Sequence, residues 1–232
     1  MSVIMQCEDL TKRFGKDTAL DGIDLTIESG KIVGLLGPNG SGKTTLIKLT
    51  NGILQPTGGS VRICGCIPGK DTKSIISYLP DIDYLPGHMN AEGLFKMFND
   101  FFEDFDIEKA QEMLASLKLS PKDRLGKFSK GNREKVALVL AMSRRAKLYL
   151  LDEPMGGADP AARDYILSSI IGNYREEAAV VISTHLIADV ERILDEAVFI
   201  NKGKLIFHRS IDEIRQTEGK SADALFREVF GC

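Results

Sequence analysis

The segment Gly-Pro-Asn-Gly-Ser-Gly-Lys-Thr-Thr at residues 37–45 restricts the fold of this chain more than any other feature of its sequence. An apolar run at residues 32–36 precedes it, and residues 45–49 have the composition of a helix. The pattern G-x-x-x-x-G-K-[ST] between a strand and a helix predicts a loop whose backbone N–H groups surround a polyphosphate at the positive end of the helix. The alternative is a glycine-rich turn with an incidental lysine, which the strand-to-helix context disfavours.

The residues of this loop divide the binding of phosphate and metal among them. The glycines let the backbone approach phosphate without a side chain in the way. Lys43 is expected to reach the β- and γ-phosphates, and the Thr44 hydroxyl is expected to hold Mg²⁺. The predicted nucleotide-binding residues here are Gly37, Pro38, Asn39, Gly40, Ser41, Gly42, Lys43, Thr44 and Thr45. We therefore interpret the chain as a nucleoside triphosphatase.

The composition is that of an ordinary globular protein. A chain of 232 residues is long enough for a large core. The formal net charge of −3 argues against a broad nucleic-acid footprint, so no nucleic-acid partner is expected. No apolar run approaches the roughly 18 residues of a membrane span, and the N-terminus lacks the layout of a signal peptide. We expect a cytosolic protein.

Strand and helix patterns alternate along the chain, except in a helical middle section. Short β-like runs occupy residues 7–14, 23–27, 32–36, 61–63 and 75–79, and later 148–151, 179–183 and 197–200. Helical patterns cover about 90–145, 161–174, 187–194 and a tail at about 211–232. The alternation predicts the α/β class, with a mostly parallel sheet covered by helices. We expect one domain over residues 1–232, with an N-terminal antiparallel β subdomain and an inserted helical subdomain.

Two carboxylates, Asp152 and Glu153, end an apolar strand, where a parallel sheet presents side chains to a ligand. Asp152 is expected to order Mg²⁺ through water, and Glu153 to polarise the attacking water as general base. A further strand ends in Ser183-Thr184-His185, and His185 is expected to contact the γ-phosphate and the water. The alternative reading is a pair of solvated acids and a structural histidine.

The four cysteines, Cys7, Cys64, Cys66 and Cys232, are scattered. Cys64 and Cys66 are the only close pair, at the end of an apparent strand where alternate residues share a face. A redox or metal site there is one interpretation, and small apolar packing is the other.

At this point the chain resembles the nucleotide-binding domain of ATP-binding cassette (ABC) proteins over nearly its whole length. Besides the phosphate loop and the Asp152-Glu153 pair, the match is carried by Phe14, the signature-like segment 128–133, the D-loop-like segment 156–159 and His185. The resemblance implies a P-loop NTPase core that takes ATP and Mg²⁺. It also implies that Phe14 stacks on adenine, that Asp159 lies at the nucleotide and that His185 is the switch histidine.

In the family, two such domains pack head to tail around ATP. By resemblance, Ser129 and Gly131 serve the γ-phosphate bound by the partner subunit, which is identical or a second ABC subunit. The chain departs from the family pattern at Lys130 and Asn132 in the signature. It also has Asp81 where the family has the Q-loop glutamine, and an aspartate there is still able to bind Mg²⁺ or its water.

The resemblance extends to subunits that pair with a separately encoded transmembrane permease, often in exporters. It implies an ATPase at the inner face of the cell membrane, and an aromatic stripe at residues 94–105 then offers a docking surface together with Tyr84 and Leu85. Apolar core is the other reading of that stripe. The rival functions are a soluble ABC ATPase that remodels a protein or nucleic-acid complex, and a nucleotide-binding scaffold without turnover. The presence of Glu153 and His185 disfavours the scaffold.

Overall fold

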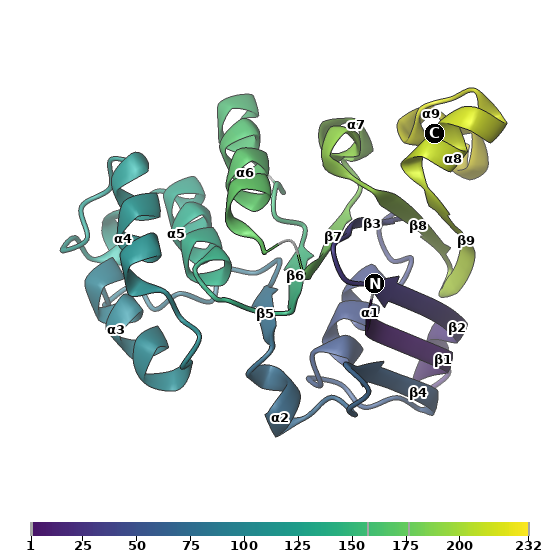
Figure 1. Ribbon diagram of the computed structural model, residues 1–232, viewed down its shortest axis with the longest axis horizontal. Helices are drawn as coiled ribbons and strands as arrows, with labels where there is room; N and C mark the ends of the chain where they lie inside the picture. The colour runs from purple at the N-terminus through teal and green to yellow at the C-terminus, as the bar shows by residue number, and fades with distance from the viewer. Residues whose placement is uncertain (1, 157, 176, 232) are drawn as a thin grey trace.

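A six-stranded sheet forms the centre of the protein, in a computed structural model that describes residues 2–156, 158–175 and 177–231 (Figure 1). The strand order is β5 (Ile76–Leu79), β6 (Leu148–Asp152), β7 (Ala179–Thr184), β3 (Ile32–Leu36), β8 (Glu196–Asn201) and β9 (Lys204–Ser210). The first five strands pair in parallel, and β9 runs antiparallel to β8. The predicted mostly parallel sheet is therefore confirmed.

The central strands are apolar on both faces because the sheet separates two cores. Every residue of β3, β6 and β7 is buried, as expected for parallel strands covered on both sides. In β3, Ile32 and Leu36 join the core beneath the helices, whereas Val33 and Leu35 join the core toward the N-terminal sheet. Neighbouring residues of a strand point to opposite faces, so one short run supplies both cores.

The N-terminal β subdomain is a three-stranded antiparallel sheet with the order β2 (Asp17–Glu28), β1 (Val3–Phe14) and β4 (Gly58–Ile63). It packs over α1 (Lys43–Thr50) and one face of the central sheet through a shared apolar core. The predicted N-terminal antiparallel sheet is confirmed, although β1 begins at Val3, four residues earlier than the strand predicted at residue 7.

A group of helices lies at one end of the molecule, between β5 and β6 in the chain (Figure 1). They are α3 (Ala91–Phe101), α4 (Ile107–Ser116) and α5 (Lys130–Met142). Asn90, Asp106 and Ser129 cap them, each side chain accepting a hydrogen bond from a backbone N–H in the first turn. The inserted helical part of the predicted fold is therefore present.

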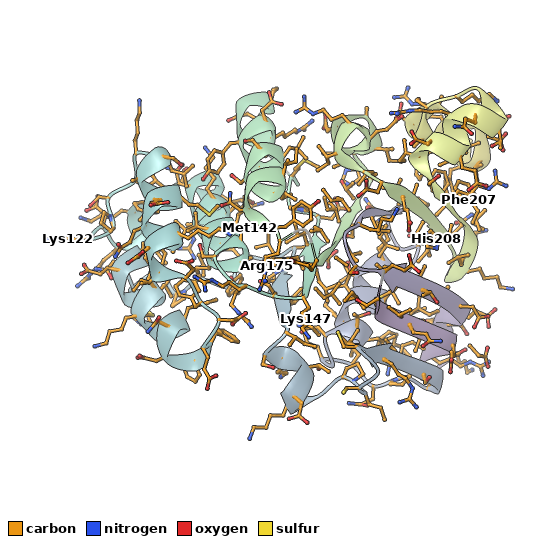
Figure 2. All side chains as sticks on the ribbon, in the orientation of Figure 1. Lys122, Met142, Lys147, Arg175, Phe207 and His208 are labelled. Atoms are coloured by element: carbon orange, nitrogen blue, oxygen red, sulfur yellow. The ribbon has the colours of Figure 1, made fainter. Side chains whose placement is uncertain are left out.

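The remaining helices are the four-residue α2 (Lys70–Lys73), then α6 (Pro160–Asn173), α7 (Ile187–Val190), α8 (Ile211–Glu218) and α9 (Ala222–Phe230). Figure 1 shows α8 and α9 at the opposite end of the molecule from α3 and α4. Figure 2 places Lys122 at the helical end, and Phe207 and His208 of β9 at the other. No helix in the described part of the chain is long and apolar enough to cross a membrane.

Two local predictions differ from the structure, and one strand was not predicted. The helix expected at 187–194 ends as α7 at Val190 and continues only as a 3₁₀ turn. The strand β9 was not predicted; a two-residue turn at Lys202 and Gly203, both with positive φ, returns the chain as a hairpin. Cys64 and Cys66 do not share a strand face, because β4 ends at Ile63 and the chain turns so that Cys66 pairs back with Ile63.

The described cysteines Cys7, Cys64 and Cys66 are free, and burial raises the pKa of the Cys7 thiol to about 12. Cys232 lies outside the described residues. Among the residues that the structure describes, no group of three or more His, Cys, Asp or Glu side chains is placed to hold a metal ion.

Candidate active site

The glycine-rich loop connects β3 to α1 at the carboxyl edge of the central sheet. Two of its glycines are required by the backbone of this chain. Gly42, the N-cap of α1, has a φ of 112°, a conformation that side chains disfavour. A Cβ at Gly37 would lie 2.3 Å from the carbonyl oxygen of Ile200. These two positions therefore restrict the loop to residues without a side chain at the N-terminus of α1, where an anion is favoured.

Lys43 turns back over this loop. Its Nζ donates hydrogen bonds to the carbonyl oxygens of Gly37 at 2.7 Å and Pro38 at 3.3 Å, and lies 3.8 Å from a Glu153 carboxylate oxygen. Burial lowers the pKa of the Lys43 ammonium, while the charges of Glu153 and Asp152 act in the opposite direction. A cation is thus held at the place where the sequence predicts phosphate.

Asp152 is fully buried at the end of β6, beside the first turn of α1. Its Oδ1 accepts hydrogen bonds from the hydroxyls of Ser183, at 2.6 Å, and Thr44, at 3.1 Å. Its Oδ2 is buried without a hydrogen-bond partner in the described part of the chain. Burial raises the pKa of Asp152, and the two hydroxyl hydrogen bonds oppose that rise. An unpartnered buried carboxylate oxygen beside a threonine hydroxyl is suited to a hard cation.

Ser183 is a site residue that sequence reasoning missed. It was noted only as part of a strand end, although its position before Thr184 and His185 was the available signal. The parallel register of β6 and β7 places Asp152 opposite Ser183. This register cannot be read from the sequence of either strand alone, so the contact was not predicted.

Glu153 and His185 face each other at the ends of the same two strands. The Nδ1 atom of His185 lies 3.1 Å from both carboxylate oxygens of Glu153. Glu153 has a φ of 49°, which is rare for a residue with a side chain, and its N–H donates to the Ser183 carbonyl oxygen at 2.9 Å. The His185 side chain is 45% exposed, compared with 19% for Glu153. One edge of the pair is therefore open to solvent and to a ligand.

Phe14 lies at the end of β1 and is 48% exposed. The Nζ of Lys12 is 5.0 Å from the centre of its ring, a cation–π distance, and also donates to the carbonyl oxygen of Gln55 at 2.8 Å. An exposed aromatic ring at a strand end is available for stacking.

The signature-like residues occupy the N-terminus of α5. Ser129 is exposed and caps its own helix by accepting a hydrogen bond from the N–H of Asn132 at 3.2 Å. Lys130 is 78% exposed, with its Nζ 3.8 Å from the carboxylate of Glu134. A Cβ at Gly131 would meet nothing within 4 Å among the described residues. Neither Ser129 nor Gly131 makes a hydrogen bond to the described phosphate loop, so this part of the predicted site is not brought together within one chain.

The D-loop-like segment is described except for Gly157, which lies outside the described residues. Asp159 caps α6 by accepting a hydrogen bond from the N–H of Ala162 at 2.8 Å. Asp81 is exposed just beyond β5. Its charge also raises the pKa of Asp152, but less than the burial of Asp152 does. A cavity whose lining includes Asp81, Lys130 and Glu153 joins the end of the sheet to the signature helix.

The aromatic stripe divides between core and surface. Leu94, Phe95 and Phe105 are buried, whereas Phe101 is 77% exposed. Phe98 and Phe102 are partly buried and line a groove of about 390 Å³ whose walls also include Tyr84, Tyr78 and Arg144. The core reading is therefore right for the first set, and Leu85, predicted as part of the docking surface, is buried as well. Phe98 and Phe102 line the groove, whereas Phe101 is exposed outside it.

Comparisons with known proteins agree with this geometry. The family model described as "ABC transporter" matches residues 20–156. The ABC transporter ATP-binding protein YdbJ of Bacillus subtilis (strain 168) is 32% identical over 94% of this chain and 73% of its own length. The linearmycin resistance ATP-binding protein LnrL of the same organism is 29% identical over 88% of this chain and 68% of its own length.

A solved structure of an ATP-binding subunit of an ABC transporter superimposes with a TM-score of 0.88 at 26% identity, covering 98% of this chain and 99% of that chain. Eight curated relatives are 28–32% identical, and the chain spans 58–76% of their lengths. The chain belongs to the ABC transporter family. It is an ATP-binding ATPase subunit of that family.

Proposed function

We propose that this chain hydrolyses ATP at a site completed by a second ABC subunit, and that the cycle drives export through a separate transmembrane permease. The observation that carries the proposal is the meeting of Lys43, Asp152, Glu153 and His185 at one edge of the sheet. These groups come from the phosphate loop and from two strand ends, and they provide a cation, a metal-binding oxygen and a base within a few ångströms.

The phosphate loop is proposed to bind the triphosphate. Lys43 exchanges its contacts with the loop carbonyls and Glu153 for the β- and γ-phosphates, and the N-terminus of α1 serves the same anion. Phe14 is proposed to stack on the adenine. Because Phe14 is half exposed and at a strand end, the base can reach its ring without rearrangement of the core.

Mg²⁺ fits the oxygen atoms present beside the phosphate loop. Thr44 would offer its hydroxyl, and Asp152 its unpartnered Oδ2 directly or through water. Asp81, exposed near the same edge, would reach the ion or its water. Mg²⁺ is usually held by one or two protein groups together with phosphate oxygens, so a larger carboxylate cluster is not needed. When bound, the ion neutralises charge that develops on the phosphates.

Glu153 and His185 are proposed to act on the attacking water. Glu153 accepts the water's proton as general base, and the hydrogen bond from His185 Nδ1 fixes the direction of its carboxylate. With Nδ1–H donated to Glu153, Nε2 of a neutral His185 ring is left as an acceptor for the water, whereas a contact with the γ-phosphate requires a proton on Nε2 as well. The exposed edge of His185 provides the access that this role requires.

A second ABC subunit, identical or not, is proposed to complete each site with its signature segment. Ser129 and Gly131 are exposed, and packing among the described residues gives no reason for a glycine at position 131. The glycine is accounted for if the nucleotide held by the second subunit must come close to the backbone at position 131. Asp159 is proposed to lie at the same interface, in addition to its observed role as a helix cap.

The permease is proposed to dock at the groove lined by Tyr84, Phe98 and Phe102. The groove is largely apolar, and its lining includes Pro80 and Tyr84 from the loop that carries Asp81. A short amphipathic helix bound in the groove would therefore lie next to the nucleotide site. Export is supported by the similarity to a linearmycin resistance protein. On this proposal the chain is peripheral to the membrane, held at the cytoplasmic face by its partner.

Substitution of Glu153 by glutamine tests the proposal. The variant keeps the shape of the side chain, so ATP binding is expected to remain, while hydrolysis slows by at least about a hundredfold. Sedimentation should show an ATP-dependent dimer that accumulates. Glu177→Gln makes the same chemical change at an exposed side chain and serves as the control. Near-normal single-turnover hydrolysis by Glu153→Gln would remove Glu153 from this role.

A further inference from the structure

Arg163 lies in the first turns of α6, directly after the D-loop-like segment. Its backbone N–H donates to the carbonyl oxygen of Asp159 at 2.9 Å, as expected within a helix. Its guanidinium makes two contacts outside that helix. Nε donates to the carbonyl oxygen of Ala158 at 3.0 Å, and Nη1 donates to Oδ2 of Asp189 at 2.8 Å. One planar side chain therefore joins the D-loop-like segment to α7.

Asp189 lies on α7, four residues after His185. A cavity of about 240 Å³ lies between α6 and α7 at this point, with Arg163 and Asp189 among its lining residues. Side-chain ion pairs connect the elements on the two sides of this cavity. The Arg163 and Asp189 side chains are 30% and 35% exposed, so this contact is partly shielded from water.

The contacts around Arg163 form a closed ring that includes Glu153. Two backbone hydrogen bonds connect Glu153 to Ala158 stepwise, from Gly156 N–H to Glu153 O and from Ala158 N–H to Met155 O. Arg163 then connects Ala158 to Asp189, the backbone returns to His185, and His185 contacts Glu153. A displacement of Ala158 would therefore act on Glu153 along the chain and on His185 through Arg163.

We infer that Arg163 is a positioning residue that makes the geometry of the Glu153–His185 pair depend on the position of the D-loop-like segment. The inference rests on the proposed function, in which Glu153 and His185 act on water. Arg163 touches neither the phosphate loop nor either of these two side chains in the described structure, so it acts on turnover and not on nucleotide affinity. Arginine suits this place because its fork holds two acceptors in fixed directions, which lysine does not.

A second ion pair between the same parts of the molecule provides a matched control. Arg192, in the 3₁₀ turn after α7, donates to Oδ1 of Asp164 on α6 at 2.5 Å. Among the described residues, Arg192 makes no hydrogen bond to the D-loop-like segment. Its side chain is 62% exposed and that of Asp164 is 72% exposed.

The test compares Arg163→Met, Arg163→Lys, Asp189→Asn and Arg192→Met in the full chain, with KM and kcat for ATP and binding of ATP by calorimetry. Arg163→Met is expected to lower kcat about tenfold to a hundredfold, the range that a small misplacement of a catalytic group produces. KM and ATP affinity should stay unchanged. Arg163→Lys should be intermediate, and the double variant with Asp189→Asn should be no worse than Arg163→Met alone.

Amide hydrogen exchange of the nucleotide-free protein gives a readout that does not depend on activity. The N–H of Ala158 bonds to Met155 O, and the N–H of Glu191 bonds to Ile187 O, so both report on the joined segments. Arg163→Met should speed exchange at both amides, and Arg192→Met should leave Ala158 unchanged.

An unchanged kcat in Arg163→Met, or an equal fall in Arg192→Met, would overturn the inference. Glu153→Gln, measured alongside, separates a failure of the proposed function from a failure of the inference about Arg163. If Glu153→Gln remains active, the proposed function itself fails. If Glu153→Gln is inactive while Arg163→Met is fully active, only the role of Arg163 fails.

Discussion

Removal of the Ser183 hydroxyl tests how Asp152 is prepared for a metal ion. Ser183 donates a 2.6 Å hydrogen bond to a carboxylate that burial already makes harder to ionise. In Ser183→Ala the pKa of Asp152 should rise further. A hydrogen bond to a charged group contributes about 1.5–3 kcal/mol, and about 1.4 kcal/mol corresponds to a factor of ten. We therefore expect the apparent Mg²⁺ affinity to fall about ten- to a hundredfold, as for other partners of metal ligands.

The assay is ATP hydrolysis against Mg²⁺ concentration at about pH 6 and about pH 8, because a metal that binds an ionised carboxylate competes with protons. The loss should be larger at the lower pH. Ser77→Ala is the control, since Ser77 is also buried in the sheet and its hydroxyl donates to the carbonyl oxygen of Ala141 at 2.7 Å, away from Asp152. A half-saturating Mg²⁺ concentration that is the same in Ser183→Ala and the parent protein would refute the reasoning.

Three further substitutions address other parts of the molecule. Phe14→Ala should weaken ATP binding by about 1–3 kcal/mol, by analogy with base stacking, and spare the chemical step; unchanged affinity in calorimetry would place adenine elsewhere. Lys130→Gly, in a Glu153→Gln background, should reduce the ATP-dependent dimer more at low salt than at high salt, because an exposed charge is screened. If the Glu153→Gln protein forms the same fraction of dimer with and without Lys130→Gly at both salt concentrations, Lys130 contributes nothing to dimerisation. Glu196→Gln should cost about 1–3 kcal/mol of unfolding free energy at neutral pH, since the 2.7 Å hydrogen bond from His208 lowers the pKa of Glu196. That stabilisation is present above the ordinary value of 4.5 and lost as pH falls through the lowered pKa, so urea unfolding of parent and variant should converge in acid. A gap that persists there would contradict the assignment.

The phosphate loop could be recognised from the sequence because its chemistry is contiguous. The glycines, Lys43 and Thr44 lie within one short segment, and the strand before it and the helix after it have strong local patterns. The α/β class and the mostly parallel sheet followed from the same alternation. The hairpin strand β9 was missed because its pairing with β8 depends on a turn at Lys202 and Gly203, which gives a weaker signal than an apolar run.

The sequence by itself thus determined the fold class and the residue types that are expected to bind nucleotide. Only the tertiary structure decided which distant side chains meet them. Ser183 reaches Asp152 because β7 pairs with β6 in one register, and a shift by one residue would turn its side chain to the other face. Arg163 reaches Asp189 because α6 and α7 lie side by side across a cavity. Such contacts depend on packing between segments far apart in the chain, and local residue patterns do not contain that information.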